Sequence, residues 1–263
     1  MLVSRRSWNR QLKLLVASQF LTTLPVLGRR EVSAEDVGAS LAYFPLVGLF
    51  LGAILAGVDW VLSLILPSFI VNVFIIIALL LFTGALHVDG FIDTCDALFG
   101  RGTPQERWRI MSDSRVGSFG VVGAFCLLLL FYVSLGEIAE AYRTVALILM
   151  PALSRWSMVY AIFAFPYAKP AGLGKAFEEQ ANWRKLALAT LLVLASTLGL
   201  LIIKGLVFIF VGLTLVFAVW VIAAALGLFL KRKFDGLTGD SYGAINEVTQ
   251  VAVLIFFGVI SRW

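Results

Sequence analysis

The sequence predicts an all-α membrane protein, a polytopic bundle of about seven transmembrane helices. Of its 263 residues, 60% are hydrophobic and only 14% are charged, and the mean hydropathy is +0.96. About a quarter of the residues of a soluble domain are charged, so this composition lies far outside the soluble range. Several uncharged stretches also reach the roughly 20 residues that a spanning helix needs. We expect one membrane-embedded domain over residues 1–263, in which residues 1–36 form a cytoplasmic or interfacial amino-terminal segment.

Seven apolar stretches are candidates for the spans. They cover residues 37–58, 60–86, 118–136, 144–168, 186–203, 205–230 and 248–261. The fourth is broken only by Arg155, and the last reaches spanning length when residues 244–246 are included. Residues 12–27 are too short to span, so we expect an interfacial or re-entrant helix that ends at Pro25 rather than a removable signal.

Lysine and arginine are distributed unevenly between alternate loops of this topology. Seventeen of the 21 lie before residue 37 or within residues 87–117, 169–185 and 231–243, whereas the opposite loops and the carboxyl end hold three. Because cytoplasmic loops are enriched in basic residues, we expect the amino terminus and the larger loops in the cytoplasm and the carboxyl terminus outside. The same asymmetry explains a pI near 9.4 without a nucleic-acid partner.

An acidic segment directly follows the second apolar stretch. If this segment is helical, Asp89, Asp93 and Asp96 share one face, because they are spaced by four and three residues. No lysine or arginine lies between His87 and Gly100 to neutralise them. Crowded carboxylates take up protons or bind a cation, and Mg²⁺ prefers a few carboxylates combined with substrate phosphate oxygens. The pattern predicts a Mg²⁺ site, with a solvated helix end as the alternative.

A short helix is predicted after the acidic segment. Thr103 and Glu106 form a capping box at its start. This helix is expected to turn Trp108, Ile110 and Met111 toward the membrane surface and to place Arg107 and Arg109 near headgroups or phosphates. A purely structural role is the alternative.

The segment Asp113-Ser114-Arg115 then leads the chain back to the bilayer. Arg115 can either contact a substrate phosphate or pair with Asp113. These three residues, together with Lys169 in the next cytoplasmic loop, are candidate substrate-binding residues.

A glycine-rich turn precedes the last span. Its Thr238 and Gly239 are candidate phosphate ligands, because backbone amides in such turns can point at phosphate oxygens. On a helix, Asp240 and Glu247 share a face, and Glu247 enters the bilayer below Asp240. A buried acid needs a partner, either a metal shared with the first acidic motif or Arg155.

Two further polar residues are candidates for chemistry. Arg155 lies within a span, where contact with lipid costs about 2.5–3.5 kcal/mol, so it must face the protein interior. It either pairs with Glu247 or Asp59, or binds phosphate in a cavity that opens to the cytoplasm. His87, the only histidine, is a candidate base or a hydrogen-bond partner at a helix end.

Three separated motifs, in this order, give the chain a resemblance to a known family. They are His87-x-Asp89-Gly90-x-x-Asp93-Thr94-x-Asp96, Ile110-Met111-x-Asp113-Ser114-Arg115-x-Gly117-x-x-Gly120 and Gly236-Leu237-Thr238-Gly239-Asp240-x-x-Gly243-Ala244-x-Asn246-Glu247. With residues 43–48, they resemble the cobalamin synthases, the adenosylcobinamide-GDP ribazoletransferases, over residues 20–250 or so. Ala97, where the family pattern suggests glycine, and the region Leu24–Val26 depart from it without removing a charged group.

The resemblance implies a Mg²⁺-dependent transferase in the cytoplasmic (inner) membrane of a bacterium or archaeon, with its active site facing the cytoplasm. The family joins adenosylcobinamide-GDP to α-ribazole or its 5′-phosphate, giving adenosylcobalamin or its 5′-phosphate and GMP. A hydroxyl attacks a diphosphate phosphorus, which requires charge neutralisation and a proton acceptor. The implied metal ligands are Asp89, Asp93, Asp96 and Asp240. The implied catalytic residues are Asp96, Asp240, Glu247 and His87, and the implied substrate-binding residues are Asp113, Ser114, Arg115, Arg155, Lys169, Thr238, Gly239 and Asn246.

Other function classes stay open from the sequence. Membrane prenyltransferases and CDP-alcohol phosphotransferases also bind diphosphates through Mg²⁺ and aspartates, but the second aspartate cluster of the former and the Ala-Arg pair of the latter are missing. A cation-coupled transporter, with Arg155, Asp59 and Glu247 on an ion path, is the non-enzymatic alternative. Expected partners are the two substrates and the bilayer. Gly48 and Gly52 form a GxxxG pattern that allows close helix packing, so a homo-oligomer, or association with other cobalamin-assembly enzymes, is left open.

Overall fold

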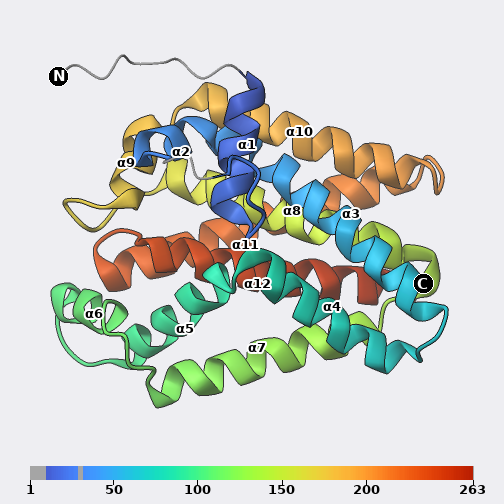
Figure 1. Cartoon of the computed structure of the whole chain (residues 1–263), viewed down its shortest axis with the longest axis horizontal. Coiled ribbons are helices and arrows are strands. Elements are labelled where there is room, and N and C mark those ends of the chain that lie inside the picture. The colour runs from blue at the N-terminus through green and yellow to red at the C-terminus, as the bar shows by residue number, and fades with distance from the viewer. Residues whose placement is uncertain (1–9, 29–31, 263) are drawn as a thin grey trace.

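The computed structural model of the chain describes residues 10–28 and 32–262 and is almost entirely helical (Figure 1). Six helical segments in this part of the chain are long and apolar enough to span a membrane. They are α2 to α3 (Ala34–Ser40, through the 3₁₀ turn η1, Leu41–Tyr43, to Phe44–Ser63), α7 (Ser118–Gly136), α8 (Glu140–Ala164), α10 (Trp183–Ile202), α11 (Phe208–Phe234) and α12 (Gly239–Ile260). The predicted all-α polytopic fold is confirmed.

A seventh candidate is a bent pair of helices, which forms either a broken span or a re-entrant loop. α4 (Ser68–Thr83) and α5 (Leu86–Phe99) meet at 93°, and together they pass the length and hydropathy criteria for one span. The span predicted for residues 60–86 is therefore wrong at both ends, because α4 begins only at Ser68 and ends at Thr83. Gly84 ends α4 in the left-handed conformation with φ 59°, which glycine adopts readily, and Ala85 follows with φ 55°. The break turns the acidic segment away from the direction of α4.

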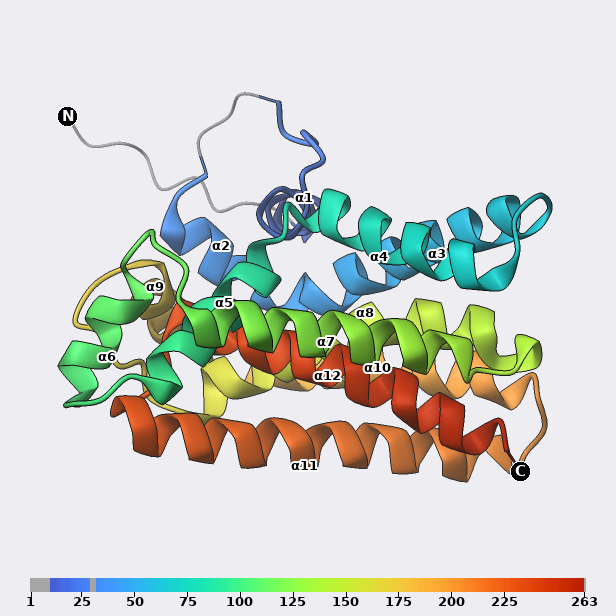
Figure 2. The same cartoon turned by 90° about the horizontal axis from the view of Figure 1, so that it is seen from below.

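α1 (Arg10–Leu21) supports this break from outside the bundle. Thr23, just after α1, donates its backbone N–H to the Phe82 carbonyl at 2.8 Å and its hydroxyl to the Leu81 carbonyl at 3.0 Å. The carbonyls left open at the end of α4 are thus satisfied. The helix ends at Leu21 rather than at the predicted Pro25, because the backbone of Thr23 bonds to α4 instead of continuing α1. Figure 2 shows α1 end-on, lying across the direction of α3.

α8 runs through the centre of the bundle and is buried along nearly all of its length. α3 packs closely on it, because Cβ atoms on Gly48 or Gly52 would collide with the backbone of Pro151 or Ile148. The close packing predicted from the GxxxG pattern is confirmed. Its partner is α8 of the same chain, so this face is not available for a second copy.

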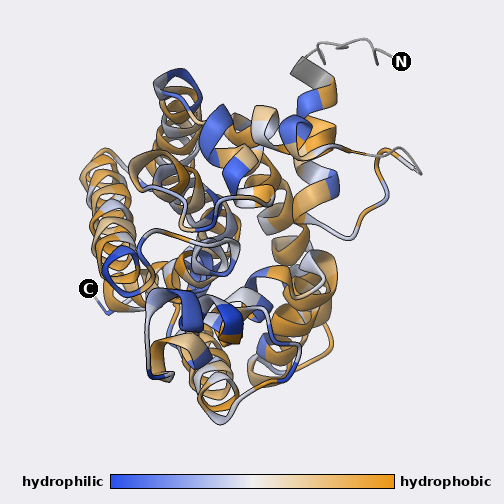
Figure 3. Cartoon of the chain, turned by 90° about the vertical axis from the view of Figure 1, so that its left-hand side faces the viewer, coloured by the Kyte–Doolittle hydropathy of each residue, from blue (hydrophilic) through white to orange (hydrophobic). Residues whose placement is uncertain are grey.

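All loops that carry the sequence motifs lie at one end of the bundle, which we call the motif end. Figure 2 shows α2, α6 (Pro104–Met111), α9 (Leu173–Gln180) and the start of α12 there, whereas the carboxyl terminus lies at the other end. Figure 3 looks onto the motif end, where hydrophilic segments lie mainly on loops and helix ends. The basic loops 87–117, 169–185 and 231–243 thus share one end, as predicted, whereas Arg5, Arg6, Arg29 and Arg30 lie outside the described residues. Which side of a membrane this end faces stays a prediction.

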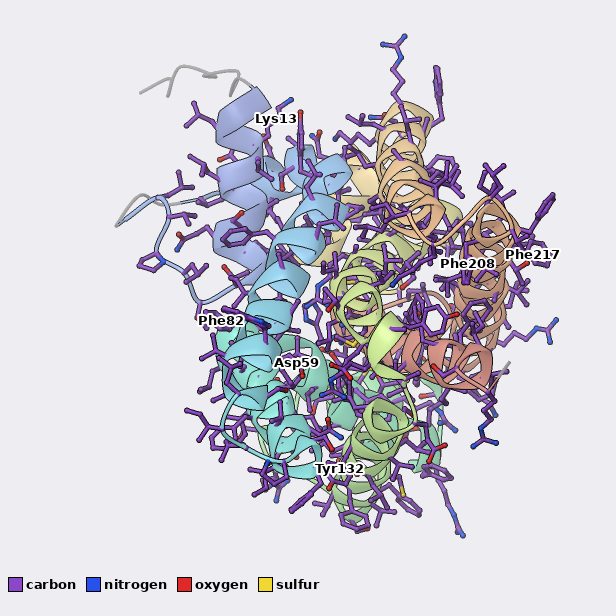
Figure 4. The ribbon with its side chains drawn as sticks, turned by 90° about the vertical axis from the view of Figure 1, so that its right-hand side faces the viewer. Lys13, Asp59, Phe82, Tyr132, Phe208 and Phe217 are labelled. Atoms are coloured by element: carbon purple, nitrogen blue, oxygen red, sulfur yellow. The ribbon has the colours of Figure 1, made fainter. Side chains whose placement is uncertain are left out.

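The opposite end holds a matched charge network. Arg143 at the start of α8 donates to Asp59 of α3 at 2.8 Å, to the Asn72 side chain of α4 at 2.7 Å and to the Leu135 carbonyl of α7 at 3.0 Å. Figure 4, viewed from this end, shows Asp59 among the helices and Phe217 on the outside. Of the two partners expected for Arg155, Asp59 is thereby excluded, because it pairs with Arg143. The network ties four helices together.

Candidate active site

Three carboxylates from two distant segments meet at the motif end, and we call this group the acid site. It consists of Asp89 and Asp93 of α5 and Asp240 in the first turn of α12. The charge of Asp93 interacts with those of Asp89 and Asp240, and Asp240 also interacts with Asp89. The structure therefore brings the first and third sequence motifs together.

Two glycines allow the helices that carry the acid site to approach each other. A Cβ on Gly90 would lie 2.9 Å from the Asp240 Cα, and a Cβ on Gly243 would lie 2.9 Å from the His87 carbonyl oxygen. Any larger residue at either position would push α5 and α12 apart. The local reason for Asp240's position is the amino-terminal cap of α12, where the Thr238 hydroxyl accepts the Ser241 backbone N–H at 3.2 Å.

Lys169 supplies the positive charge that acts on this site. It interacts electrostatically with both Asp93 and Asp240, and its Nζ lies 3.4 Å from the Ser112 hydroxyl at the end of α6. No direct ion pair joins Lys169 to either carboxylate among the described residues. Of the predicted substrate-binding residues, Lys169 is the cation that the structure brings to the acid site.

The loop that carries Lys169 is fixed by backbone pairing. Ala168 donates its N–H to the Leu237 carbonyl, and Leu237 donates its N–H to the Pro166 carbonyl, both at 2.8 Å. Tyr167, between them, forms an isolated parallel bridge with Leu237. Partial burial and the nearby charge of Asp240 raise the pKa of the Tyr167 hydroxyl. Sequence reasoning missed this pairing, which no local pattern shows.

Asp96 has a different position from the other acids of its helix. Its two carboxylate oxygens accept the backbone N–H groups of Gly117 and Gly120, each at 2.8 Å. These amides belong to the start of α7, where a helix leaves N–H groups unpaired and favours negative charge. A Cβ on either glycine would collide with the Asp96 carboxylate. Asp96 thus lies beside the acid site and caps α7.

Asp113 and Arg115 pair with each other at the surface. Arg115 donates its backbone N–H and both Nε and Nη2 to the Asp113 carboxylate, at 2.7–3.1 Å. These hydrogen bonds lower the pKa of Asp113 to about 2. Of the two roles expected for Arg115, pairing with Asp113 is the one present, and its side chain is 88% exposed. Ser114 lies exposed between them.

α6 holds the site together rather than facing the membrane. Arg107 donates to the Ala97 and Leu98 carbonyls of α5 at 2.7 and 2.8 Å, and the Trp108 indole donates to the Phe234 carbonyl at the end of α11 at 2.9 Å. Helix carboxyl ends leave carbonyls unpaired, which explains why these side chains turn inward.

The surface role predicted for Arg107, Trp108 and Met111 is therefore wrong; Met111 is buried against Thr238. The predicted capping box is confirmed, and its hydrogen bonds from Thr103 lower the pKa of Glu106.

A second polar group lies deeper, about two helical turns from Asp240 along α12. Arg155 is fully buried, as predicted, and interacts electrostatically with Glu247 and with His87. Glu247 accepts hydrogen bonds from the side chains of Asn246 at 3.0 Å and Gln250 at 2.7 Å.

The charges of this deeper group are not among those that act on Asp93 or Asp240. Both His87 nitrogens and two Arg155 nitrogens have no hydrogen-bond partner. The candidates Arg155, Glu247, His87 and Asn246 thus form a buried group of their own. Thr238 is also buried, and Gly239 is exposed beside Asp240.

The donor set of the acid site fits a metal that binds together with substrate. Within residues 10–28 and 32–262, no three or more histidine, cysteine or acidic side chains form a ready-made metal cage. Mg²⁺ is usually held by one or two carboxylates plus substrate phosphates and waters. Asp89, Asp93 and Asp240 offer such oxygens without a complete cage.

Comparisons with known proteins agree over most of the chain. Residues 13–258 match the family model described as cobalamin-5-phosphate synthase. The adenosylcobinamide-GDP ribazoletransferase of Desulforamulus reducens is 36% identical over 247 residues, which cover 93% of this chain and 96% of the relative. The enzyme of the same name from Syntrophobacter fumaroxidans is 37% identical over 242 residues, with 90% and 94% coverage. No solved structure matches. The chain belongs to the cobalamin-5-phosphate synthase family.

Proposed function

We propose that this protein is a membrane-embedded adenosylcobinamide-GDP ribazoletransferase. It joins adenosylcobinamide-GDP to α-ribazole or its 5′-phosphate and releases GMP, which is a late step in the assembly of cobalamin. The proposal is carried by one observation together with the family match. Acidic side chains from α5 and α12, separated by most of the sequence, converge with Lys169 at the end of the bundle that carries the motifs.

The reaction requires a site that binds a diphosphate. In our assignment, Asp89, Asp93 and Asp240 hold Mg²⁺, which when bound neutralises negative charge on the diphosphate and the leaving GMP. Lys169 contributes a further positive charge at the same place. Asp96 positions α5 against α7 through its two backbone hydrogen bonds.

The attacking hydroxyl of the ribazole must lose a proton. Among the acids proposed as bases, Asp240 lies at the acid site, whereas Glu247 lies deeper with one oxygen engaged by two amide groups. We therefore assign proton acceptance to the Asp240 carboxylate and a supporting role to Glu247, Arg155 and His87. All three are buried, and they come from α12, α8 and α5 respectively.

A direct assay tests the activity. The purified full-length protein in nanodiscs is incubated with adenosylcobinamide-GDP, α-ribazole and Mg²⁺, and cobalamin and GMP are measured by chromatography. Asp93→Asn should lower turnover by at least about a hundredfold, because a neutral amide replaces a charged metal ligand and weakens stabilisation of the transition state.

Asp235→Asn is the matched control. Asp235 is an exposed aspartate at the same end, in a left-handed conformation that asparagine tolerates. The Asp235→Asn variant should leave turnover unchanged. Full activity of Asp93→Asn, or equal loss in both variants, would remove the acid site from the mechanism.

We also propose that the motif end faces the cytoplasm of the cell that makes the protein. The basic residues of four loops support this orientation through the positive-inside rule. In a background without Cys95 and Cys126, the exposed positions Ser114 and Lys204 lie at opposite ends and can each be changed to cysteine. A membrane-impermeant thiol reagent added to intact spheroplasts should label the Lys204→Cys protein and spare the Ser114→Cys protein. The reverse pattern contradicts the orientation.

A further inference from the structure

Lys169 has a feature that the proposed reaction does not by itself require. Its charge acts on two carboxylates of the acid site, yet it forms no direct ion pair with either of them. Its Nζ is held instead by a long hydrogen bond of 3.4 Å to the Ser112 hydroxyl. The lysine is therefore near the acids without being locked onto them.

The backbone brings Lys169 to this place. The residue directly before it, Ala168, is bonded to Leu237, three residues before Asp240 in the sequence. A Cβ on Gly236 would lie 2.8 Å from the Cα of Ala168, so the two segments touch at their main chains. A flexible four-carbon side chain on a fixed backbone can reach the acid site and can also leave it.

The balance of charges at the acid site indicates a role for Lys169. Asp89, Asp93 and Asp240 bring three like charges together, and Lys169 is the cation that acts on Asp93 and Asp240. Repulsion between neighbouring carboxylates would otherwise push α5 and α12 apart. A divalent cation would compete with Lys169, because both are attracted by the same negative charges.

We propose that Lys169 is a built-in counter-cation of the acid site, which holds the carboxylates together in the substrate-free protein and gives them up when a divalent cation binds. The released ammonium group then turns toward a phosphate oxygen of the diphosphate. This second step rests on the proposed function, whereas the exchange of Lys169 for a divalent cation does not.

Metal binding without substrate tests the exchange. Purified full-length protein in phosphatidylcholine nanodiscs is titrated with Mn²⁺, and free Mn²⁺ is measured by its electron paramagnetic resonance signal. Lys169→Met should bind Mn²⁺ about tenfold more tightly than the wild type, because the competing charge is gone. Lys169→Arg keeps the charge and should bind as the wild type does, while Asp93→Asn should bind more weakly.

Lys231→Met is the matched control, because Lys231 is exposed at the same end, in the last turn of α11. It should leave Mn²⁺ affinity unchanged. Equal tightening in both lysine variants would assign the effect to the general surface charge and overturn the proposal. Unchanged or weaker binding by Lys169→Met, or no Mn²⁺ binding by any form, would overturn it as well.

A second measurement avoids substitution and therefore any failure to fold. Reductive methylation of the wild-type protein is followed at each lysine by mass spectrometry, with and without Mg²⁺. Mg²⁺ should accelerate methylation at Lys169 by severalfold and leave Lys231 unchanged. An unchanged rate at Lys169 would contradict the exchange. If cobalamin formation fails while both metal experiments succeed, the proposed function falls and the lysine exchange stands.

Discussion

The two ends of the bundle hold charge in opposite ways. At the end away from the motifs, the guanidinium of Arg143 has direct partners in Asp59, Asn72 and the Leu135 carbonyl. Positive and negative charge are equal there, and the side chains of Arg143 and Asp59 are only 12% and 11% exposed. The charges of this buried pair are therefore balanced within the protein itself.

The acid site at the motif end has an excess of negative charge instead. Asp89, Asp93 and Asp240 lie within electrostatic range of one another, and Lys169 is near two of them without a direct ion pair. Asp89 is exposed and the other two carboxylates are half-buried, so water weakens their repulsion, but neighbouring like charges still favour the binding of a cation. The difference between the ends supports the proposal that the acid site binds a cation together with substrate.

The largest effect is expected at the balanced end. Asp59→Ala leaves Arg143 buried without its counter-charge and should lower the free energy of unfolding by about 3–5 kcal/mol. The double variant Asp59→Leu with Arg143→Met should recover most of this loss, because it removes both charges. Unfolding in mixed micelles measures the stability. A double variant as unstable as Asp59→Ala would show that the pair does more than balance charge.

A smaller loss is expected for Asp96. Asp96→Ala leaves the Gly117 and Gly120 amides without an acceptor and should cost about 2 kcal/mol of unfolding free energy. Turnover per folded molecule then separates two roles. If Asp96 only positions α5, Asp96→Ala lowers turnover moderately, and Asp96→Asn, which keeps one acceptor oxygen, restores part of that turnover. Loss as deep as that of Asp93→Asn, with no recovery in Asp96→Asn, would instead make Asp96 a metal ligand.

A substitution in the acid site should raise the free energy of unfolding rather than lower it. Without divalent cations, Asp93→Asn relieves repulsion with Asp89, one helical turn away, and should raise the unfolding free energy by about 0.5 kcal/mol while turnover is lost. Excess Mg²⁺ should stabilise the wild type more than the variant, because it binds the intact site more tightly. Destabilisation of the metal-free variant would mean that Asp93 serves the fold.

The smallest effect is expected at the exposed pair Asp113–Arg115. The pKa of Asp113 is lowered to about 2, below the value of about 3.9 for an unfolded aspartate. Its stabilising contribution is therefore complete above about pH 4 and is lost as the pH falls toward 2. Asp113→Asn should not change how stability varies between pH 5 and 8, measured by thermal unfolding. A difference in that window would indicate a partner other than Arg115.

Much of the acid site was predictable from the sequence. The helical spacing of Asp89 and Asp93 and their freedom from nearby basic residues are local properties, and α5 confirms the helix. Asp240 was a candidate from its helical spacing with Glu247 and its place after a glycine-rich turn, and the resemblance to a family added the rest of the third motif. Lys169 was a candidate only because it lies in a basic loop, and its place beside the acids depends on the pairing of residues 166–168 with Leu237.

Other features could not be predicted, because they depend on contacts between distant segments. The partner of Asp59 is Arg143 rather than Arg155, and a polar Asn72 inside an apolar stretch was the only local sign of that network. Trp108 looked like a residue for the membrane surface, yet its indole closes the end of α11. A side chain's type gives its bonding capacity, but only packing decides which open backbone group it meets.

The sequence alone determined the class of this protein, because hydropathy, helical period and the distribution of basic residues act over neighbouring residues and need no knowledge of long-range contacts. It also determined which residues carry unusual charge. The tertiary structure alone decided how α4 breaks before α5 at 93°, that Asp96 caps α7, and that Arg143 is the partner of Asp59. The reason is physical: these outcomes follow from the need of buried polar groups to find partners, and the partners lie far away along the chain.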